Sequence, residues 1–281
     1  MANKKALVLE GGGLRGIFSA GVLDCFMDND IRFDYVVGVS AGACNTFAYI
    51  ANERGYIKKA MTQKNRKDSF YGLPQMVESH KFVNLEKVFY EYTKKYNFSF
   101  ENFLSSKVAW EMVATNIQTG KAEYLHSNEL DKARLIGTAS CSLPLLTDPV
   151  EIDGQLYLDG GMADSIPFQR ALDLGYNKIV VVCTRKKGNF SKVSTAQKPM
   201  YKSAYRDYPE FLKTVNKRTA LYRRQIEQVE SQAEHGDAFL IRPTLPEVGR
   251  LENDLDELSL SYYHGYTKAL EYLDNLKRYL Q

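Results

Sequence analysis

The sequence predicts an α/β protein with three layers, in which helices cover both faces of a mostly parallel central sheet. Twice within the first fifty residues, a short strand-forming run leads through a glycine-containing turn into a stretch with helical periodicity. The runs are residues 6–9 and 35–39, and the helical stretches are residues 17–27 and 43–51. Such units place successive strands parallel, because each helix crosses over the sheet. A third observation, the β-branched run at residues 178–183, predicts another buried strand.

The middle of the chain predicts strands that pair locally. Residues 108–116 and 122–126 are rich in strand-forming residues and lie close enough in sequence to form a hairpin or a sheet edge. Residues 149–152 and 155–158 flank Asp153-Gly154, a pair that favours a tight two-residue turn. We therefore expect a hairpin whose second strand ends just before Asp159.

The remaining elements follow from apolar spacing. Helices are predicted at residues 84–96, 130–140, 209–234 and 255–280. Residues 209–234 contain neither an internal glycine nor an internal proline, which favours one long helix. A last strand is predicted at residues 238–241, directly before Arg242-Pro243, because a residue that precedes proline avoids helical geometry.

We expect a single domain over residues 1–281. Its core is predicted at about residues 5–185, with a cap-like insertion at about residues 57–103 and a C-terminal extension at about residues 186–281. The insertion is irregular, basic and aromatic, and Gly72-Leu73-Pro74 predicts a break within it.

Composition excludes some classes of protein but selects no function. Apolar residues make up 44% and charged residues 25% of the chain, and the net charge is +3, as in ordinary globular proteins. No stretch approaches the roughly 20 apolar residues of a membrane-spanning helix, and the first residues lack a signal-peptide pattern. We expect a cytoplasmic protein that at most touches the inner face of the membrane. The cysteines are widely spaced, which favours reduced core thiols over disulfides or a metal site; they are Cys25, Cys44, Cys141 and Cys183.

Ser40 is the strongest candidate for a catalytic nucleophile. It is the centre of Gly38-Val39-Ser40-Ala41-Gly42, between a β-branched run and a helical stretch. A serine at such a strand-to-helix turn is exposed at the sheet edge, and Gly38 and Gly42 let the neighbouring backbone pass closely. The competing interpretation is a serine whose hydroxyl caps the helix N-terminus.

A glycine loop follows the first predicted strand and predicts an oxyanion hole. Its sequence is Gly11-Gly12-Gly13-Leu14-Arg15-Gly16. We expect residues 11–14 to form the hole, with the amides of Gly12, Gly13 and Leu14 directed at a substrate oxygen and assisted by the following helix N-terminus. Arg15 has two open interpretations, the binding of an anionic headgroup or a structural ion pair.

The same loop matches the G-x-G-x-x-G pattern of dinucleotide-binding folds through Gly11, Gly13 and Gly16. Those folds hold the ribose with an acidic residue at the end of the second strand. Asp34 precedes the second predicted strand instead, and no Gly-Lys-Ser/Thr follows the loop. Nucleotide binding is therefore the weaker interpretation, and we expect no cofactor.

Asp159 is a better candidate than any histidine for the base that activates Ser40. It ends a predicted strand and precedes Gly160 and Gly161, so no side chain obstructs its approach to the serine. An ordinary aspartate, with a pKa of about 3.9, is a weak base, so the site must shield it from water. An α/β-hydrolase triad needs a histidine in a loop after a late strand, and none of the four histidines has that place. They are His80, His126, His235 and His264.

Three motifs in this order resemble the patatin-like phospholipase family. They are G-G-G-x-R-G at residues 11–16, G-x-S-x-G at residues 38–42 and D-G-G at residues 159–161. Residues 139–144 are similar to the A-S-x-x-x-P segment of that family, and the resemblance covers about residues 5–185, with weaker motifs beyond.

The resemblance implies a patatin-like α/β fold with a Ser-Asp dyad, in which Ser40 is the nucleophile and Asp159 is its partner. It implies that the glycine loop is the oxyanion hole and that neither a metal nor another cofactor is required. The implied reaction is hydrolysis of acyl esters of glycerolipids or lysophospholipids through an acyl-enzyme. Two alternatives stay open: a histidine-dependent α/β-hydrolase-type esterase, and a weakly active lipid-binding regulatory protein.

Two basic stretches with interspersed aromatic residues predict transient contact with an anionic membrane surface, at about 1 kcal/mol per well-placed cation. They comprise Lys58, Lys59, Lys64, Arg66 and Lys67, and Arg185, Lys186, Lys187, Lys192, Lys198, Lys202 and Arg206. Two solvated loops are the other interpretation. We expect no nucleic-acid partner, because the net charge is modest and no recognition motif is present.

Overall fold

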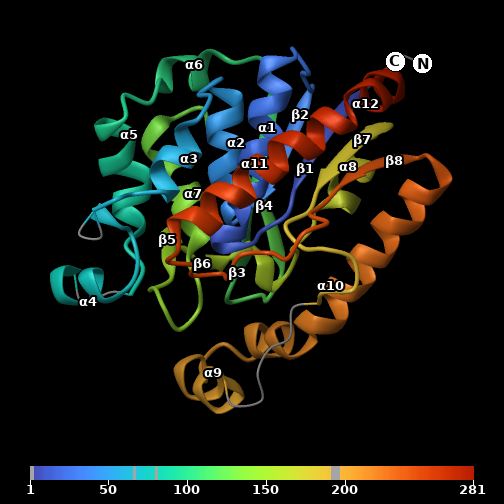
Figure 1. Cartoon of the computed structure of the whole chain (residues 1–281). Coiled ribbons are helices and arrows are strands. Elements are labelled where there is room, and N and C mark those ends of the chain that lie inside the picture. Colours follow the sequence, from blue (N-terminus) through green and yellow to red (C-terminus); the bar gives the residue numbers. More distant parts are fainter. Residues whose placement is uncertain (1–2, 66–67, 80–81, 191–196) are drawn as a thin grey trace.

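The computed structural model describes residues 3–65, 68–79, 82–190 and 197–281, which form one central sheet between helices (Figure 1). The sheet has eight strands in the order β5-β6-β3-β2-β1-β7-β8, and β4 pairs with β3 beside this path. The strands are β1 Lys5–Leu9, β2 Tyr35–Val39, β3 Ala109–Asn116, β4 Ala122–Leu125, β5 Val150–Ile152, β6 Gln155–Asp159, β7 Lys178–Val182 and β8 Ala238–Ile241.

The sheet is parallel around β1 and antiparallel beyond β3. β1 pairs with β2 and β7, which pair in turn with β3 and β8, all in the same direction. β4 and β6 pair with β3 in the antiparallel sense, as β5 does with β6. Asp153 and Gly154, which join β5 to β6, have φ angles of 51° and 75°. Positive φ at both residues is the geometry that favours an Asp-Gly hairpin turn.

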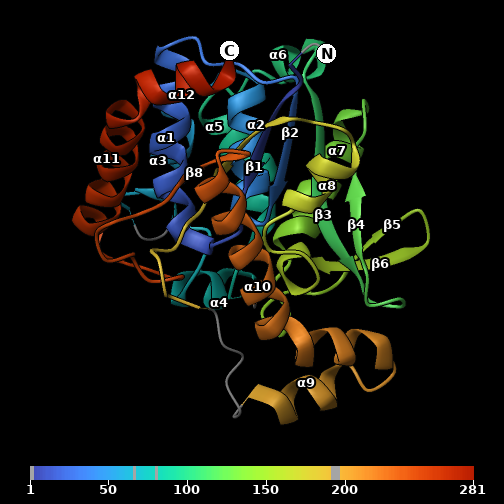
Figure 2. The ribbon, with the colours of Figure 1, turned by 90° about the vertical axis from the view of Figure 1, so that its right-hand side faces the viewer.

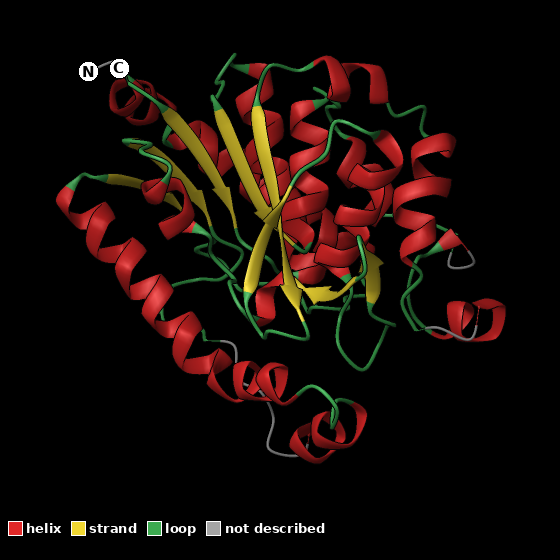
Figure 3. Ribbon diagram, turned by 180° about the vertical axis from the view of Figure 1, so that it is seen from behind, coloured by secondary structure: helices red, strands yellow, loops and turns green. Residues whose placement is uncertain are grey.

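Helices cover both faces of the sheet (Figure 2). The alternation of side chains along β1 shows the two faces: Leu7 and Leu9 belong to the core cluster that α1, α2 and α11 share, whereas Ala6 and Val8 pack in the cluster of α8 and α10. Figure 3 shows the strands enclosed between these helices from behind. The predicted three-layer α/β fold with a mostly parallel sheet is confirmed.

The helices agree with the prediction where they are long. They are α1 Gly16–Asp28, α2 Ala41–Ile50, α3 Tyr56–Met61, α4 Leu73–Ser79, α5 Tyr92–Lys95, α6 Phe100–Ser105, α7 Leu130–Cys141, α8 Phe168–Asp173, α9 Lys198–Ala204, α10 Pro209–His235, α11 Leu255–Glu271 and α12 Leu273–Leu280. In the described part of the chain, none of them has the length and apolar character needed to cross a bilayer.

Two helix predictions need correction. The helix predicted at residues 255–280 is divided at Tyr272 into α11 and α12. The helix predicted at residues 84–96 is a π-helical segment, Lys87–Glu91, that continues into α5. The helices α3, α4 and α6 were not predicted, because six or seven residues give too little periodicity to recognise. α4 begins within the predicted break at Leu73, since proline is tolerated in a first helical turn.

The C-terminal helix α11 packs directly on α1 through two glycines. A Cβ added to Gly21 of α1 would lie 2.0 Å from the Tyr262 carbonyl oxygen, and one added to Gly265 of α11 would lie 2.0 Å from the Phe18 carbonyl oxygen. The Tyr262 hydroxyl also donates to the buried Asp24 carboxylate at 2.5 Å. That the chain forms a single domain stays a prediction, and this backbone contact is the feature that favours it.

We expect Gly265→Ala to lower the free energy of unfolding by about 1–3 kcal/mol, because the added methyl must push two helices apart. Helix propensity alone would favour the alanine by about 1 kcal/mol, so the sign separates packing from propensity. Urea denaturation measures the effect, with Thr267→Ala, exposed on the same helix, as the control. An unchanged or higher midpoint for Gly265→Ala would contradict the close contact of α1 and α11.

Candidate active site

Ser40 lies at the sharp turn between β2 and α2. Its backbone has φ 54° and ψ −119°, a conformation rare for a residue that carries a Cβ. The Ser40 amide donates to the Ser140 hydroxyl at 2.9 Å, and the Ser40 carbonyl accepts from the Ala43 amide at 2.8 Å. The Ser40 side chain makes no capping hydrogen bond. Its hydroxyl is therefore not used as a helix cap, and the strained turn has the form of a nucleophile elbow.

Strand β3 places Asp159 beside Ser40. Val113 of β3 pairs with Val39, the last residue of β2, and the next residue, Ala114, pairs with Asp159, the last residue of β6. Because β4 pairs with residues 112–115 of β3, it must occupy the opposite edge of that strand. β2 and β6 therefore follow one another along a single edge of β3. The serine and the carboxylate leave the sheet at neighbouring positions of that edge.

The C-terminal end of α7 joins the two residues through their backbones. Ser140 accepts the amide of Ser40, and two residues later the Ser142 carbonyl accepts the Asp159 amide at 2.7 Å. Sequence reasoning gave neither serine a role. The one signal was the likeness of residues 139–144 to a segment of the resembling family.

The Asp159 carboxylate has one bound and one unpaired oxygen. Oδ1 accepts from the Gly161 amide at 2.7 Å, whereas Oδ2 is buried and has no hydrogen-bond partner among the described residues. Burial raises the pKa of the Asp159 carboxyl, and the nearby Ser40 hydroxyl, the Gly161 amide and the charges of Arg218 and Arg250 act in the opposite direction. The carboxylate is therefore a stronger base than an exposed aspartate.

The glycine loop leaves two amides for an oxyanion. The Leu14 amide donates to the Arg250 carbonyl at 3.1 Å, and the Gly11 amide donates to the Ser165 carbonyl at 3.4 Å. The amides of Gly11 and Leu14 thus already donate to protein carbonyls, and the expectation that residues 11–14 form an oxyanion hole stays a prediction. Within the described residues, the amides of Gly12 and Gly13 have no acceptor.

Glycine is required in the loop and at other motif positions because neighbouring atoms lie where a Cβ would be. Gly13 has a φ of 61°, and its Cβ would lie 2.7 Å from Arg250. A Cβ added to the following four would lie within 2.6 Å of a neighbouring atom: Gly16, Gly38, Gly42 and Gly160. At Gly42 that atom is the Leu9 carbonyl oxygen, so α2 begins directly beside the end of β1.

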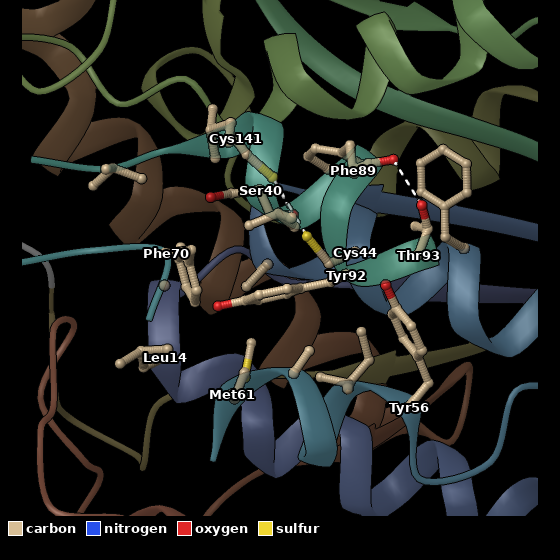
Figure 4. Close-up of a pocket in the computed structure, with 18 of the residues that line it drawn as sticks. Leu14, Ser40, Cys44, Tyr56, Met61, Phe70, Phe89, Tyr92, Thr93 and Cys141 are labelled. Carbon is tan, nitrogen blue, oxygen red and sulfur yellow. Dashed lines mark hydrogen bonds between the residues drawn. The ribbon is translucent and has the colours of Figure 1, made fainter. Parts of the chain in front are cut away.

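Two pockets meet at Ser40. The apolar pocket is built largely by the insertion, with Met61, Phe70 and Tyr92 around it and the Leu14 side chain from the glycine loop (Figure 4). The polar pocket is lined by Asp159, by the glycine loop and by arginines. The space open to water-sized spheres is about 90 Å³ in the apolar pocket and about 440 Å³ in the polar pocket. The first is lined mainly by apolar side chains, and the second also by charged ones.

The three described histidines lie away from both pockets. His235 contacts the Ser231 carbonyl at the end of α10, His264 contacts Thr244, and His126 lies against Trp110. None of them lines either pocket. His80 lies outside the described residues.

The cysteines and the basic stretches are placed as follows. All four cysteines are free thiols, and Cys44 and Cys141 meet at 3.7 Å between sulfurs in the wall of the apolar pocket. Lys58 donates to the Tyr263 hydroxyl at 2.8 Å, and Arg185 is buried 3.9 Å from Glu10. Three other members lie outside the described residues: Arg66, Lys67 and Lys192. Contact with an anionic membrane stays a prediction.

The fold and the site define a class of α/β proteins that carry a serine on a strand-to-helix elbow, a glycine loop beside it and an aspartate from an adjoining hairpin. The chain belongs to the patatin-like phospholipase family, whose family model matches residues 7–172. A second family model, described as a domain of unknown function (DUF6363), matches residues 208–281.

Similar proteins include one bacterial and several fungal chains. The chain is 31% identical over 183 residues to the uncharacterized protein YjjU of Escherichia coli strain K12, covering 64% of this chain and 51% of YjjU. It is 25% identical over 296 residues to lysophospholipase nte1 of Aspergillus niger, covering 97% of this chain and 18% of that protein. The chain thus spans about half the length of the bacterial relative and less than a fifth of the fungal one.

Among solved structures, VipD from Legionella pneumophila shares the fold, with a TM-score of 0.51 and 14% identity. The likeness covers 97% of this chain and 67% of VipD.

We expect Asp159→Asn to raise Tm at neutral pH, although it removes the expected base. When the pKa of a carboxyl is higher in the folded than in the unfolded protein, the folded protein becomes less stable as the pH rises above the unfolded-state pKa, which is about 3.9 for aspartate. Replacing Asp159 by asparagine removes the charge and therefore stabilises the folded protein above about pH 3.9, but not below it.

Thermal unfolding from pH 3.5 to 8 tests this, where about 1 kcal/mol corresponds to roughly 2–4 °C in large domains. The control is Asp153→Asn, in the exposed β5–β6 turn, where the ion pair with Lys132 is screened by solvent and contributes little. A Tm gain that does not depend on pH, or a loss at neutral pH, would contradict the buried charge at Asp159.

Proposed function

We propose that the protein is a serine acyl hydrolase that cleaves carboxylic ester bonds of lipids through a Ser-Asp dyad. The observation that carries the proposal is the shared edge of β3, which brings Ser40 and Asp159 together with one carboxylate oxygen unpaired. The strained elbow, and the two glycine-loop amides that have no acceptor among the described residues, would supply the other parts that acyl transfer requires.

The proposed first half-reaction transfers the acyl group to Ser40. The serine oxygen attacks the ester carbonyl while Asp159 Oδ2 takes the hydroxyl proton. The Gly12 and Gly13 amides donate to the carbonyl oxygen as it becomes negative, and losing one such donor typically costs about 2.7–4 kcal/mol of transition-state stabilisation. The carbon–oxygen bond to the alcohol then breaks, and the alcohol leaves with the proton from Asp159.

The second half-reaction reverses the roles with water. Asp159 takes a proton from a water molecule, whose oxygen attacks the acyl carbon and forms the carboxylic acid. The proton returns to Ser40 as the acyl–oxygen bond breaks, so the free serine is regenerated. Burial supports the role of Asp159 as the base. Because burial raises the pKa of the carboxyl, that pKa lies closer to the pKa of the serine hydroxyl, and proton transfer between the two groups becomes less unfavourable.

The proposed substrates are phospholipids or lysophospholipids. The narrow apolar pocket suits one acyl chain, and the wider polar pocket suits a glycerol-based alcohol. The names of the relatives point the same way, since the matched family is a phospholipase family and the fungal relative is called a lysophospholipase. A phospholipase A or lysophospholipase reaction at the membrane surface is therefore the proposed activity.

The histidine-dependent esterase and the weakly active lipid-binding protein make different demands on the site. A histidine-dependent esterase needs an imidazole at Ser40, and the described histidines are elsewhere. A weakly active lipid-binding protein would bind the lipid equally well without its nucleophile. No nucleotide is needed for either half-reaction.

We expect the full chain to release fatty acid from a lysophospholipid, and Ser40→Ala and Asp159→Asn each to lower kcat by at least about a thousandfold. Fatty-acid release in detergent micelles measures the rate. Ser105→Ala, exposed on α6, should retain the parental rate. Substantial turnover by Ser40→Ala would refute the nucleophile, and lipid binding with no turnover by the parent would favour the regulatory alternative.

A further inference from the structure

The polar pocket carries an unusual concentration of positive charge. Four arginines line it, against two carboxylates, Glu10 and Asp159. The arginines are Arg15, Arg185, Arg218 and Arg250. Burial and the charges of Arg185 and Arg250 lower the pKa of Arg15 to about 10, and burial together with Arg250 lowers that of Arg218. The arginines therefore repel one another, and an anion among them would relieve that repulsion.

Arg15 has guanidinium donors that the protein leaves unused. Its Nε and Nη2 atoms are buried and have no hydrogen-bond partner within the described residues. Buried donors without acceptors are costly, and a ligand with several acceptor oxygens would satisfy them. Of the two interpretations of Arg15 that the sequence left open, this favours an anionic group over a structural ion pair.

One face of α10 is attached to the turn that follows Asp159 and to Glu10, the residue after β1. Arg218, Tyr222 and Gln225 follow each other at helical spacing and so share that face. Arg218 Nε donates to the Gly161 carbonyl at 2.7 Å, the Tyr222 hydroxyl to Glu10 at 2.8 Å and the Gln225 amide to Asp164 at 2.7 Å. Arg218 is thereby fixed next to the expected base.

Arg250 is held against the glycine loop. Its carbonyl accepts the Leu14 amide, and its side chain and carbonyl lie against Gly13, where a Cβ could not fit. Both arginines belong to residues 208–281, the segment that the model of unknown function matches. The C-terminal segment thus contributes to both walls of the polar pocket.

The chemistry decides which part of a substrate occupies that pocket. Asp159 lines the polar pocket and not the apolar one. The group that returns a proton to the leaving oxygen must lie on the side of the leaving alcohol. The alcohol part of the ester therefore lies among the arginines, and the acyl part lies in the apolar pocket.

We infer that residues 208–281 form the headgroup half of the site, in which Arg218 and Arg250, with Arg15, bind a phosphate carried by the leaving alcohol. The inference rests on the proposed hydrolase activity and specifies its selectivity. An acyl ester with a phosphate on its alcohol is preferred over the uncharged ester of the same acyl chain. Guanidinium groups pair with phosphate through two parallel hydrogen bonds, which a lysine or a neutral amide cannot reproduce.

The test compares 1-oleoyl-glycerol 3-phosphate with 1-oleoyl-glycerol, which differ only in the phosphate. kcat/KM for both is measured with the full chain in mixed micelles at one mole fraction and one ionic strength. We expect the parent to prefer the phosphate ester at least tenfold. Arg250→Gln and Arg218→Gln should each reduce this ratio at least tenfold, and Arg224→Gln, exposed on α10, should leave it unchanged. Arg250→Lys, which keeps the charge, should give an intermediate ratio and serves if the glutamine variant fails to fold.

A second arm separates a headgroup site from a site for free anions. Inorganic phosphate should inhibit hydrolysis of 1-oleoyl-glycerol competitively, and less so in Arg250→Gln. Inhibition without a preference for the phosphate ester would overturn the inference in favour of a regulatory anion site. Equal kcat/KM for the two esters without inhibition would overturn it and leave the proposed hydrolase intact. If neither ester is hydrolysed, the proposed function fails and the inference fails with it.

Discussion

The pairing of β2 and β6 along one edge of β3 is the constraint on which the rest of the site depends. Ser40 and Asp159 are far apart in sequence. Ser40 directly follows the last residue of β2, which pairs with Val113, and Asp159 is the last residue of β6 and pairs with Ala114. A shift of either strand by one residue would turn its side chains to the other face and separate the two groups. The links from Ser140 and Ser142 at the end of α7 hold both strand ends in that register.

The second constraint is electrostatic. Asp159 is buried, and burial disfavours its charge, yet the proposed base must be charged to accept a proton. The Gly161 amide and the arginines of the polar pocket favour the charge without removing the effect of burial. The carboxylate is thus kept ionisable but basic, and the donors that stabilise it come from the turn after β6 and from the C-terminal segment. This explains how α10 and the loop that carries Arg250 take part in a site whose motifs all lie before residue 162.

Much of the framework could be predicted from the sequence, because its signals are local. β2 and β8 have the predicted bounds, and Asp153-Gly154 forms the predicted turn. Ser40 and Asp159 could be proposed from the sequence because glycines at fixed spacing mark the elbow and the turn. Arg218 and Arg250 have no such mark, since their contacts join segments far apart in sequence. The bond that the Leu14 amide makes could not be predicted for the same reason: its acceptor is the carbonyl of Arg250, more than two hundred residues later.

We propose that Ser40 is activated by Asp159 without a histidine. The most direct measurement is the rate at which a fluorophosphonate labels Ser40, located by peptide mass, in the parent, in Asp159→Asn and in a variant with His80, His126, His235 and His264 all replaced. We expect near-parental labelling of Ser40 without histidines and much slower labelling in Asp159→Asn. Labelling that disappears without histidines but persists in Asp159→Asn would contradict the dyad.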